Sequence, residues 1–306
     1  MTGLTWNVAA AQYPIDQLES WDAYEAKLTG WVALAVEGGA SLLVFPEYGA
    51  MELASLDPAT MGDLAGSIES VSALLPRVDA LHAALAARHG VHILAASAPR
   101  RDADGKARNA ARLFAPNGKC GTQDKLIMTR FEREQWRISG GDALRLFDTA
   151  LGRLAVLICY DSEFPLLARA AVEAGAEVLL VPSCTDSLHG YWRVRIGAQA
   201  RSLESQAYVV HSPTVGEAAW SPAVDVNRGA AAVYGPPDRV RGGDWGMPED
   251  GVLALGEEGQ PGWVHAEIDP TLVATLRADG GVLNMRHWRE QPGAATLPTV
   301  EVVSLL

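Results

Sequence analysis

Cysteine is scarce in this sequence. Only three cysteines, Cys120, Cys159 and Cys184, occur among 306 residues. A small and odd number gives no disulfide framework, so we expect a reducing compartment. No Cys-x-x-Cys pair and no histidine-rich spacing is present, which argues against a metal site.

Positive charge and long apolar runs are also lacking. The formal net charge is −12, and nucleic acids or anionic membranes are bound through basic patches. No apolar run approaches the ~20 residues of a membrane-spanning helix. Residues 1–14 contain neither a basic leader nor a long apolar core, so we expect no signal peptide. The sequence thus predicts a cytoplasmic protein without nucleic-acid or membrane partners.

The apolar content is sufficient for a full core. Apolar residues make up 48% and charged residues 20% of the chain, which is typical of a folded domain. Segments typical of strands alternate with amphipathic segments of helical period, and hairpins are mixed among them. This pattern predicts an α/β layered sandwich with mixed sheets. We predict one domain over residues 1–277 and an irregular tail over residues 278–306 that makes oligomer contacts or packs on its own domain.

One stretch, ICYDSEFP at residues 158–165, places a cysteine where a buried strand gives way to a helix. Free N–H groups and the helix dipole at such a position lower a thiol's pKa from about 8.5, which favours the nucleophilic thiolate. A cysteine at the end of an apolar strand is also commonly a small buried hydrophobe. On this stretch alone, both interpretations of Cys159 remain open.

Two further ionisable residues lie at or beside apolar strands. Glu47 ends the strand predicted at 41–47, and Lys125 lies in a strand-like segment over 120–128. A charge in such a place is costly unless it is paired or used. Taken singly, a glutamate or a lysine there is typical of a solvated turn. Together with Cys159, however, the two residues match the pattern of a known family.

These segments resemble the carbon–nitrogen hydrolase family, also called the nitrilase superfamily. Its three motifs occur here in the family's order, as FPEYGAME at 45–52, QDKLIM at 123–128 and ICYDSEFP at 158–165. A downstream block with Trp192 and the pair Arg201 and Glu204 is similar to the family's helix. The resemblance extends from AAQYP near the start to the strand predicted at 262–269.

The resemblance implies that Glu47 is the general base, Lys125 the electrostatic stabiliser and Cys159 the nucleophile. Lys125 and the backbone N–H of Tyr160 would hold the oxyanion. Many members carry a second glutamate shortly before a Gly-Gly-Asp segment, here residues 140–142. Glu132 and Glu134 both precede it, and counting back from the glycines favours Glu134. That glutamate would orient Lys125 and the substrate nitrogen.

Further residues receive weaker assignments. We assign the substrate pocket to Tyr48, Cys184 and Trp192. Asp161 is expected to brace the turn after the nucleophile. We expect Arg201 and Glu204 to form a structural ion pair, because they lie one helical turn apart.

The resemblance implies a four-layer αββα sandwich with two mixed β-sheets and a homodimer or higher homo-oligomer. It also implies a cofactor-free amidase that converts a small-molecule amide to its acid and ammonia through a thioester. Tyr160, where true nitrilases have tryptophan, favours an amide over a nitrile. A nitrilase or an N-carbamoyl-amino-acid hydrolase remains possible. So do a Cys-His hydrolase that uses His189 or His211, and a non-catalytic family member that acts as an interaction module.

Overall fold

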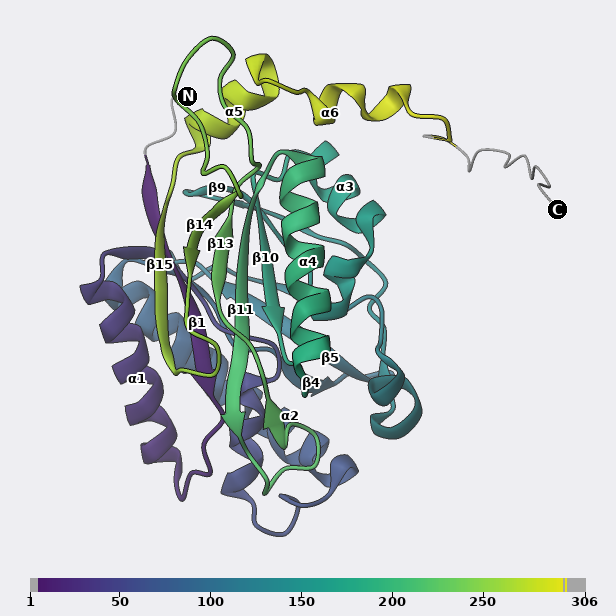
Figure 1. Cartoon of the computed structure of the whole chain (residues 1–306). Coiled ribbons are helices and arrows are strands. Elements are labelled where there is room, and N and C mark those ends of the chain that lie inside the picture. Colours follow the sequence, from purple (N-terminus) through teal and green to yellow (C-terminus); the bar gives the residue numbers. More distant parts are fainter. Residues whose placement is uncertain (1–4, 294, 296–306) are drawn as a thin grey trace, which may run out of the picture.

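Fifteen strands and six α-helices form the described part of the chain, residues 5–293 and 295 of a computed structural model (Figure 1). The strands are β1 (Trp6–Pro14), β2 (Ala40–Val44), β3 (His92–Leu94), β4 (Ala98–Arg101), β5 (Ala107–Phe114), β6 (Cys120–Asp124), β7 (Ile138–Ser139), β8 (Leu146–Thr149), β9 (Gly152–Val156), β10 (Val178–Ser183), β11 (Tyr208–Glu217), β12 (Val226–Asn227), β13 (Ala232–Tyr234), β14 (Val252–Leu255) and β15 (Gly262–Ile268). The helices are α1 (Trp21–Glu37), α2 (Leu64–His89), α3 (Pro165–Glu173), α4 (Leu188–Ser205), α5 (Pro270–Asp279) and α6 (Asn284–His287).

The strands form two mixed sheets that are joined at one point. The first sheet contains β1–β7 and β15, and the second contains β8–β11, β13 and β14. β1 pairs in parallel with β11 where Tyr13 faces Thr214 and Pro14 faces Val215. The predicted pair of mixed sheets is therefore confirmed, and this junction makes them one large curled sheet.

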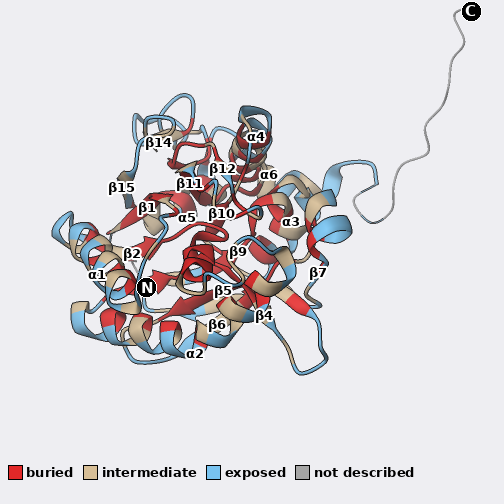
Figure 2. Ribbon diagram, turned by 90° about the horizontal axis from the view of Figure 1, so that it is seen from below, coloured by how far each residue is buried: buried red, intermediate tan, exposed pale blue. Residues whose placement is uncertain are grey.

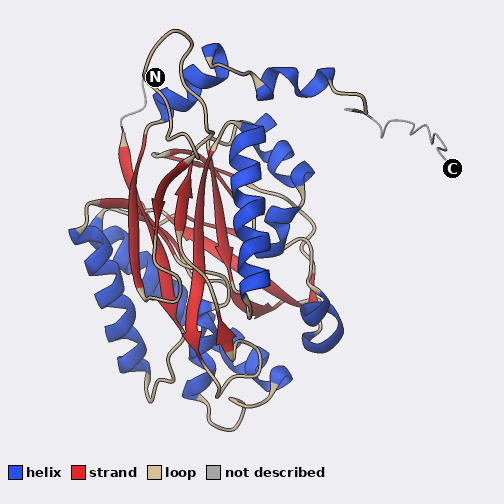
Figure 3. Cartoon of the chain, viewed as in Figure 1, coloured by secondary structure: helices blue, strands red, loops and turns tan. Residues whose placement is uncertain are grey.

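Side chains of β1 show how the layers are stacked. Val8 and Ala10 belong to the core shared with the second sheet, whereas Ala9 and Ala11 belong to the core that also contains α1 and α2. Alternate residues of a strand point to opposite faces, so the first sheet is buried on both sides. Helices α3 and α4 lie outside the second sheet (Figure 3), and buried residues fill the space between the helical layers (Figure 2). The αββα sandwich is confirmed.

Local sequence signals set the bounds of the long helix α2. The Asp63 carboxylate accepts hydrogen bonds from the backbone N–H groups of Ala65 and Gly66, which cap the helix start. Gly90 ends the helix with a left-handed φ of 68°, a conformation that costs glycine little. The amphipathic pattern of the sequence predicts a helix over residues 65–89, and the structure confirms it within one residue.

The described part of the predicted tail packs on its own chain. The boundary predicted after residue 277 falls inside α5. Beyond it, the Met285 N–H donates to Gln206 Oε1 at 3.1 Å, and the Arg169 guanidinium lies 4.6 Å from the ring centre of Trp288. Residues 294 and 296–306 of the predicted tail lie outside the described residues. Within the described residues, no helix has both the length and the apolar character needed to cross a membrane.

Candidate active site

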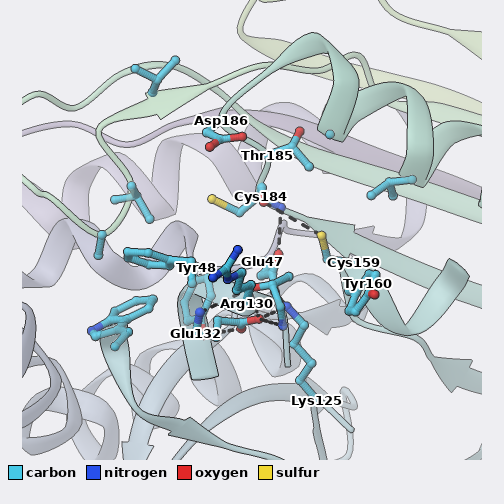
Figure 4. A pocket seen from close by; sticks show the side chains of 18 of the residues that line it. Glu47, Tyr48, Lys125, Arg130, Glu132, Cys159, Tyr160, Cys184, Thr185 and Asp186 are labelled. Atoms are coloured by element: carbon cyan, nitrogen blue, oxygen red, sulfur yellow. Dashed lines mark hydrogen bonds and ion pairs between the residues drawn. The ribbon is translucent and has the colours of Figure 1, made fainter. Parts of the chain in front are cut away.

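Four elements from both sheets meet at one cavity (Figure 4). Glu47 follows β2 after Phe45 and Pro46, and Lys125 directly follows β6, both in the first sheet. Cys159 lies three residues after β9, and Cys184 directly follows β10, both in the second sheet. All four line the same cavity. The sandwich therefore brings together the three residues that the sequence singled out for chemistry.

The Glu47 carboxylate is buried and almost fully hydrogen-bonded. Its Oε1 accepts from Lys125 Nζ at 2.7 Å and from Asn109 Nδ2 at 2.9 Å, and its Oε2 accepts from the backbone N–H of Cys184 at 2.9 Å. Burial raises the pKa of Glu47 to about 7, although the Lys125 ammonium opposes this rise. A carboxylate with this pKa is suited to accept and return protons near neutral pH.

The second glutamate at Lys125 is Glu132, and the assignment of Glu134 was wrong. Lys125 Nζ donates to Glu132 Oε2 at 2.7 Å, and both groups are buried. Glu134 instead pairs with Arg130 at the surface, where 53% of its side chain is exposed. Residues Glu132–Trp136 wind as one π-helical turn, so counting back from the glycines did not find the inward-facing residue.

A capping box fixes Glu132. Its Oε2 accepts from the Thr129 backbone N–H at 2.9 Å, and the Glu132 backbone N–H donates to Thr129 Oγ1 at 3.3 Å. Its Oε1 accepts from the Tyr48 hydroxyl at 2.8 Å. Charge and hydrogen bonds from Lys125 oppose the effect of burial, and the pKa of Glu132 is lowered. The threonine three residues before Glu132 was the sequence signal that distinguishes it from Glu134.

Burial and the neighbouring Glu47 carboxylate, rather than a helix dipole, set the pKa of the Cys159 thiol. Burial and the Glu47 charge raise its pKa well above the ordinary value, against the smaller opposing effect of Lys125. The expectation of a lowered pKa was therefore wrong, because Cys159 begins only a short 3₁₀ helix, Cys159–Glu163. At rest the thiol keeps its proton and needs a base beside it.

The backbone of Cys159 is held in a strained conformation. Its φ is 48°, in the left-handed region that a residue with a side chain rarely adopts. The Asp161 carboxylate accepts from the backbone N–H groups of Leu126 and Ile127, at 3.1 Å and 2.8 Å. Asp161 thus ties the turn of the cysteine to the loop of Lys125, as a brace. Arg201, paired with Glu204 at 2.8 Å, donates to the carbonyl of the same turn.

The cavity has a volume of about 340 Å³, enough for a small ligand. Tyr48, Tyr160 and Cys184 line it, but Trp192 does not. With 3.6 residues per turn, Trp192 lies on the face of α4 opposite to that of Gly190 and Val194, and 48% of it is exposed. The wall has these other members: Thr129, Arg130, Phe131, Glu132, Trp136, Glu163, Thr185, Asp186, Gly190, Arg193, Val194, Pro222, Ala223, Val224, Asp225 and Val226.

Neither histidine considered for a Cys-His hydrolase lines this cavity. His189 is exposed on α4. His211 is buried, its Nε2 lies 2.8 Å from Ser183 Oγ, and burial lowers its pKa to about 3. Within the described ranges, no cluster of three or more His, Cys, Asp or Glu side chains is arranged to hold a metal ion.

The hydrogen-bond partner that sequence reasoning missed is Asn109, on β5. The residues two positions away on the same face of the strand, Ala107 and Ala111, are buried alanines, and Asn109 is completely buried. A polar side chain inside a buried strand is costly unless it has a partner. That mismatch between residue type and position was the signal that could have found it.

Comparison with solved structures supports the fold. The NitFhit protein of C. elegans aligns with a TM-score of 0.70 and 22% identity over 91% of this chain and 64% of that one. An amidase from Nesterenkonia sp. AN1, solved with acrylamide, aligns with a TM-score of 0.66 and 20% identity over 89% and 94% of the two chains.

Sequence comparison gives the family. A probable hydrolase of Bacillus subtilis, YhcX, is 30% identical over 282 residues, which span 92% of this chain and only 53% of that protein. A deaminated glutathione amidase of Synechocystis is 29% identical over 80% of this chain and 86% of its own length. Residues 7–244 match the carbon-nitrogen hydrolase profile. With its motifs, its fold and most of its length in agreement, the chain belongs to the carbon–nitrogen hydrolase family, within the nitrilase superfamily.

Proposed function

We propose that this protein is a cysteine-dependent amidase that converts a small carboxamide to its acid and ammonia through a thioester. One observation carries the proposal: the Cys159 thiol lines a cavity together with a carboxylate of pKa about 7 and a buried ammonium. These groups supply a nucleophile, a base and a positive charge, which are the needs of acyl transfer from nitrogen.

Acylation begins with transfer of the thiol proton to Glu47. The sulfur attacks the carbonyl carbon, and the negative charge develops on the carbonyl oxygen. Lys125 Nζ and the backbone N–H of Tyr160, in the first turn of a short helix, would stabilise this oxygen. Glu47 then gives its proton to the leaving nitrogen. The carbon–nitrogen bond breaks, ammonia leaves and the thioester remains.

Deacylation repeats the proton transfers with water. Glu47 takes a proton from the water as its oxygen attacks the thioester carbon. The same oxyanion site stabilises the second tetrahedral intermediate. When the carbon–sulfur bond breaks, Glu47 returns the proton to the sulfur, and the acid is released. The net reaction consumes one amide and one water and gives one acid and one ammonia.

Glu132 has a supporting role in this mechanism. Its carboxylate lies 2.7 Å from Lys125 Nζ, and the Glu47 carboxylate lies at the same distance. Burial lowers the pKa of Lys125, but the charges of Glu132 and Glu47 more than offset this, so the pKa is raised and the ammonium persists. A persistent charge at a fixed point can stabilise the oxyanion without reorganisation.

The names of several relatives support an amide substrate. Deaminated glutathione amidases and omega-amidases are among the similar proteins. In one solved structure of the Nesterenkonia amidase, the acetamide moiety of fluoroacetamide is attached to the active site cysteine. Tyr160, which follows the nucleophile, favours an amide over a nitrile.

Ammonia release from a panel of short amides tests the proposal, with intact-mass detection of the acyl group on the protein. We expect turnover in the wild type, a mass increase of one acyl group on Cys159, and loss of both in Cys159→Ala. Glu47→Gln should lose turnover. The exposed cysteine gives a matched control, since Cys120→Ser removes a thiol outside the cavity and should change neither readout. Turnover retained in Cys159→Ala, or absent acylation across the panel, would contradict the proposal.

A further inference from the structure

Asn109 forms hydrogen bonds with the Glu47 carboxylate and with the backbone of Lys125. Its Nδ2 donates to Glu47 Oε1 at 2.9 Å, the same oxygen that accepts from Lys125 Nζ at 2.7 Å. Its backbone carbonyl accepts from the Lys125 backbone N–H at 2.8 Å. The side chain is completely buried and is not part of the cavity wall. Asn109 therefore fixes two groups of the site without reaching a substrate.

The hydrogen bonds of Glu47 make its two oxygens unequal. A carboxylate offers about four lone-pair positions, two on each oxygen. Asn109 and Lys125 occupy both positions on Oε1, whereas the backbone N–H of Cys184 occupies one on Oε2. The position left over is on Oε2. The Cys159 thiol donates at rest to the backbone carbonyl of Cys184 at 3.9 Å, and the N–H of the same residue holds Oε2, so the sulfur and Oε2 are both placed at Cys184.

We propose that Asn109 is a positioning residue that keeps Oε1 of Glu47 occupied, so that Oε2 alone accepts and returns the thiol proton. This inference rests on the proposed function, because it requires Glu47 to act as the base. The neutral amide suits the role, since it donates to the carboxylate without adding charge to the buried cluster of Glu47, Lys125 and Glu132. An aspartate there would place two carboxyls in contact, and they would share a proton.

A merely structural asparagine would have a different environment. Buried amides usually satisfy both their N–H₂ group and their oxygen. Here the Oδ1 atom of Asn109 has no hydrogen-bond partner among the described residues, while Nδ2 is bonded to Glu47. The side chain is therefore held in place through the base, and the effect of removing it should appear in the titration of Glu47.

The test measures the alkylation of Cys159 by iodoacetamide against pH, with the modified peptide identified by mass spectrometry. This probe needs no knowledge of the substrate. Wild-type protein should show an inflection near pH 7 from Glu47, which Glu47→Gln abolishes. In Asn109→Ala the carboxylate loses a donor, so the inflection should move up by about one pH unit, and alkylation at pH 6 should slow about tenfold.

Two further variants complete the design. Asn109→Asp keeps the side-chain shape and should also move the inflection upward, so it decides the question if the alanine variant does not fold. Ser202→Ala removes a buried hydrogen bond of 2.7 Å to the Ala207 carbonyl, far from Glu47 in the sequence, and should leave the inflection in place. An unchanged inflection in folded Asn109→Asp would overturn the inference. Absence of any Glu47-dependent inflection in the wild type would instead overturn the proposed function.

Discussion

Replacing Glu132 by glutamine would remove one of the two negative charges beside the Lys125 ammonium. Glu132 Oε2 lies 2.7 Å from Lys125 Nζ. At this separation, and with an effective dielectric constant of about 20, the attraction is roughly 6 kcal/mol. Glutamine keeps an oxygen for the hydrogen bond, and Glu47 keeps part of the charge balance. We therefore expect about 2 to 4 kcal/mol of lost transition-state stabilisation, or a kcat/KM lower by roughly 30- to 1,000-fold.

Glu134→Gln is the matched control, because it makes the same chemical change two residues away. Its pair with Arg130 is exposed, and exposed pairs contribute about 0 to 1 kcal/mol. We expect kcat/KM to stay within a few-fold of wild type. The pH dependence gives a second signature. Since the Glu132 charge raises the pKa of Glu47, Glu132→Gln should move the acidic limb of the pH profile to lower pH.

The assay is the rate of ammonia release from the best amide of the panel, measured from pH 5 to 9 alongside thermal unfolding. Equal losses of kcat/KM in Glu132→Gln and Glu134→Gln would show that the contact of Glu132 with Lys125 has no special role in the reaction. A larger loss in Glu134→Gln would refute the assignment of Glu132. A shift of the acidic limb to higher pH in Glu132→Gln would refute the electrostatic argument.

Three further predictions follow from the site and the surface. Burial raises the pKa of Glu47 from 4.5 to about 7, and Glu47 must be ionised to act as the base. We therefore expect kcat/KM to fall about tenfold per pH unit below about pH 7 and to level off above it. A pH-independent rate from pH 5 to 8 would contradict this. Asp161→Asn removes the charged acceptor of the Leu126 and Ile127 N–H groups, so the free energy of unfolding should fall by about 1 to 3 kcal/mol and kcat should fall with it, as denaturant titration and kinetics would show; unchanged values would exclude the brace. We propose that the protein forms homo-oligomers through the outer face of α4, where Ile196 is 60% exposed. Ile196→Glu should then lower the molecular mass measured by light scattering, and an unchanged mass would exclude that face.

Much of the fold and the three central site residues could be predicted from the sequence. Apolar strands and capped helices such as α2 are local features, so their residues carry the signal themselves. Glu47, Lys125 and Cys159 stand out because ionisable groups at the ends of apolar strands are costly. Their convergence was predictable because three motifs occur in the family's order.

The errors arose where the outcome depends on residues distant in the sequence or on an irregular turn. The pKa of Cys159 is set by Glu47, which belongs to the other sheet, so the local helix was a poor guide. Glu132 faces inward because a π-helical turn changes the spacing that regular helices have. Trp192 was assigned by its motif rather than by its helical face. Only the first error reflects geometry that the order of residues does not contain, because the capping threonine and the helical period carried signals for Glu132 and Trp192.

The single junction between the sheets, at Tyr13 and Thr214, has a consequence for how activity is acquired. Glu47 stands on one side of this seam and Cys159 on the other, more than a hundred residues apart in the chain. Contacts of such long sequence separation are slow to form, because the entropy of closing a long loop opposes them. A half-folded chain therefore has a thiol without its proton acceptor, and the proposed hydrolysis requires the finished tertiary structure. The rate at which turnover recovers during refolding would accordingly report how fast β1 pairs with β11.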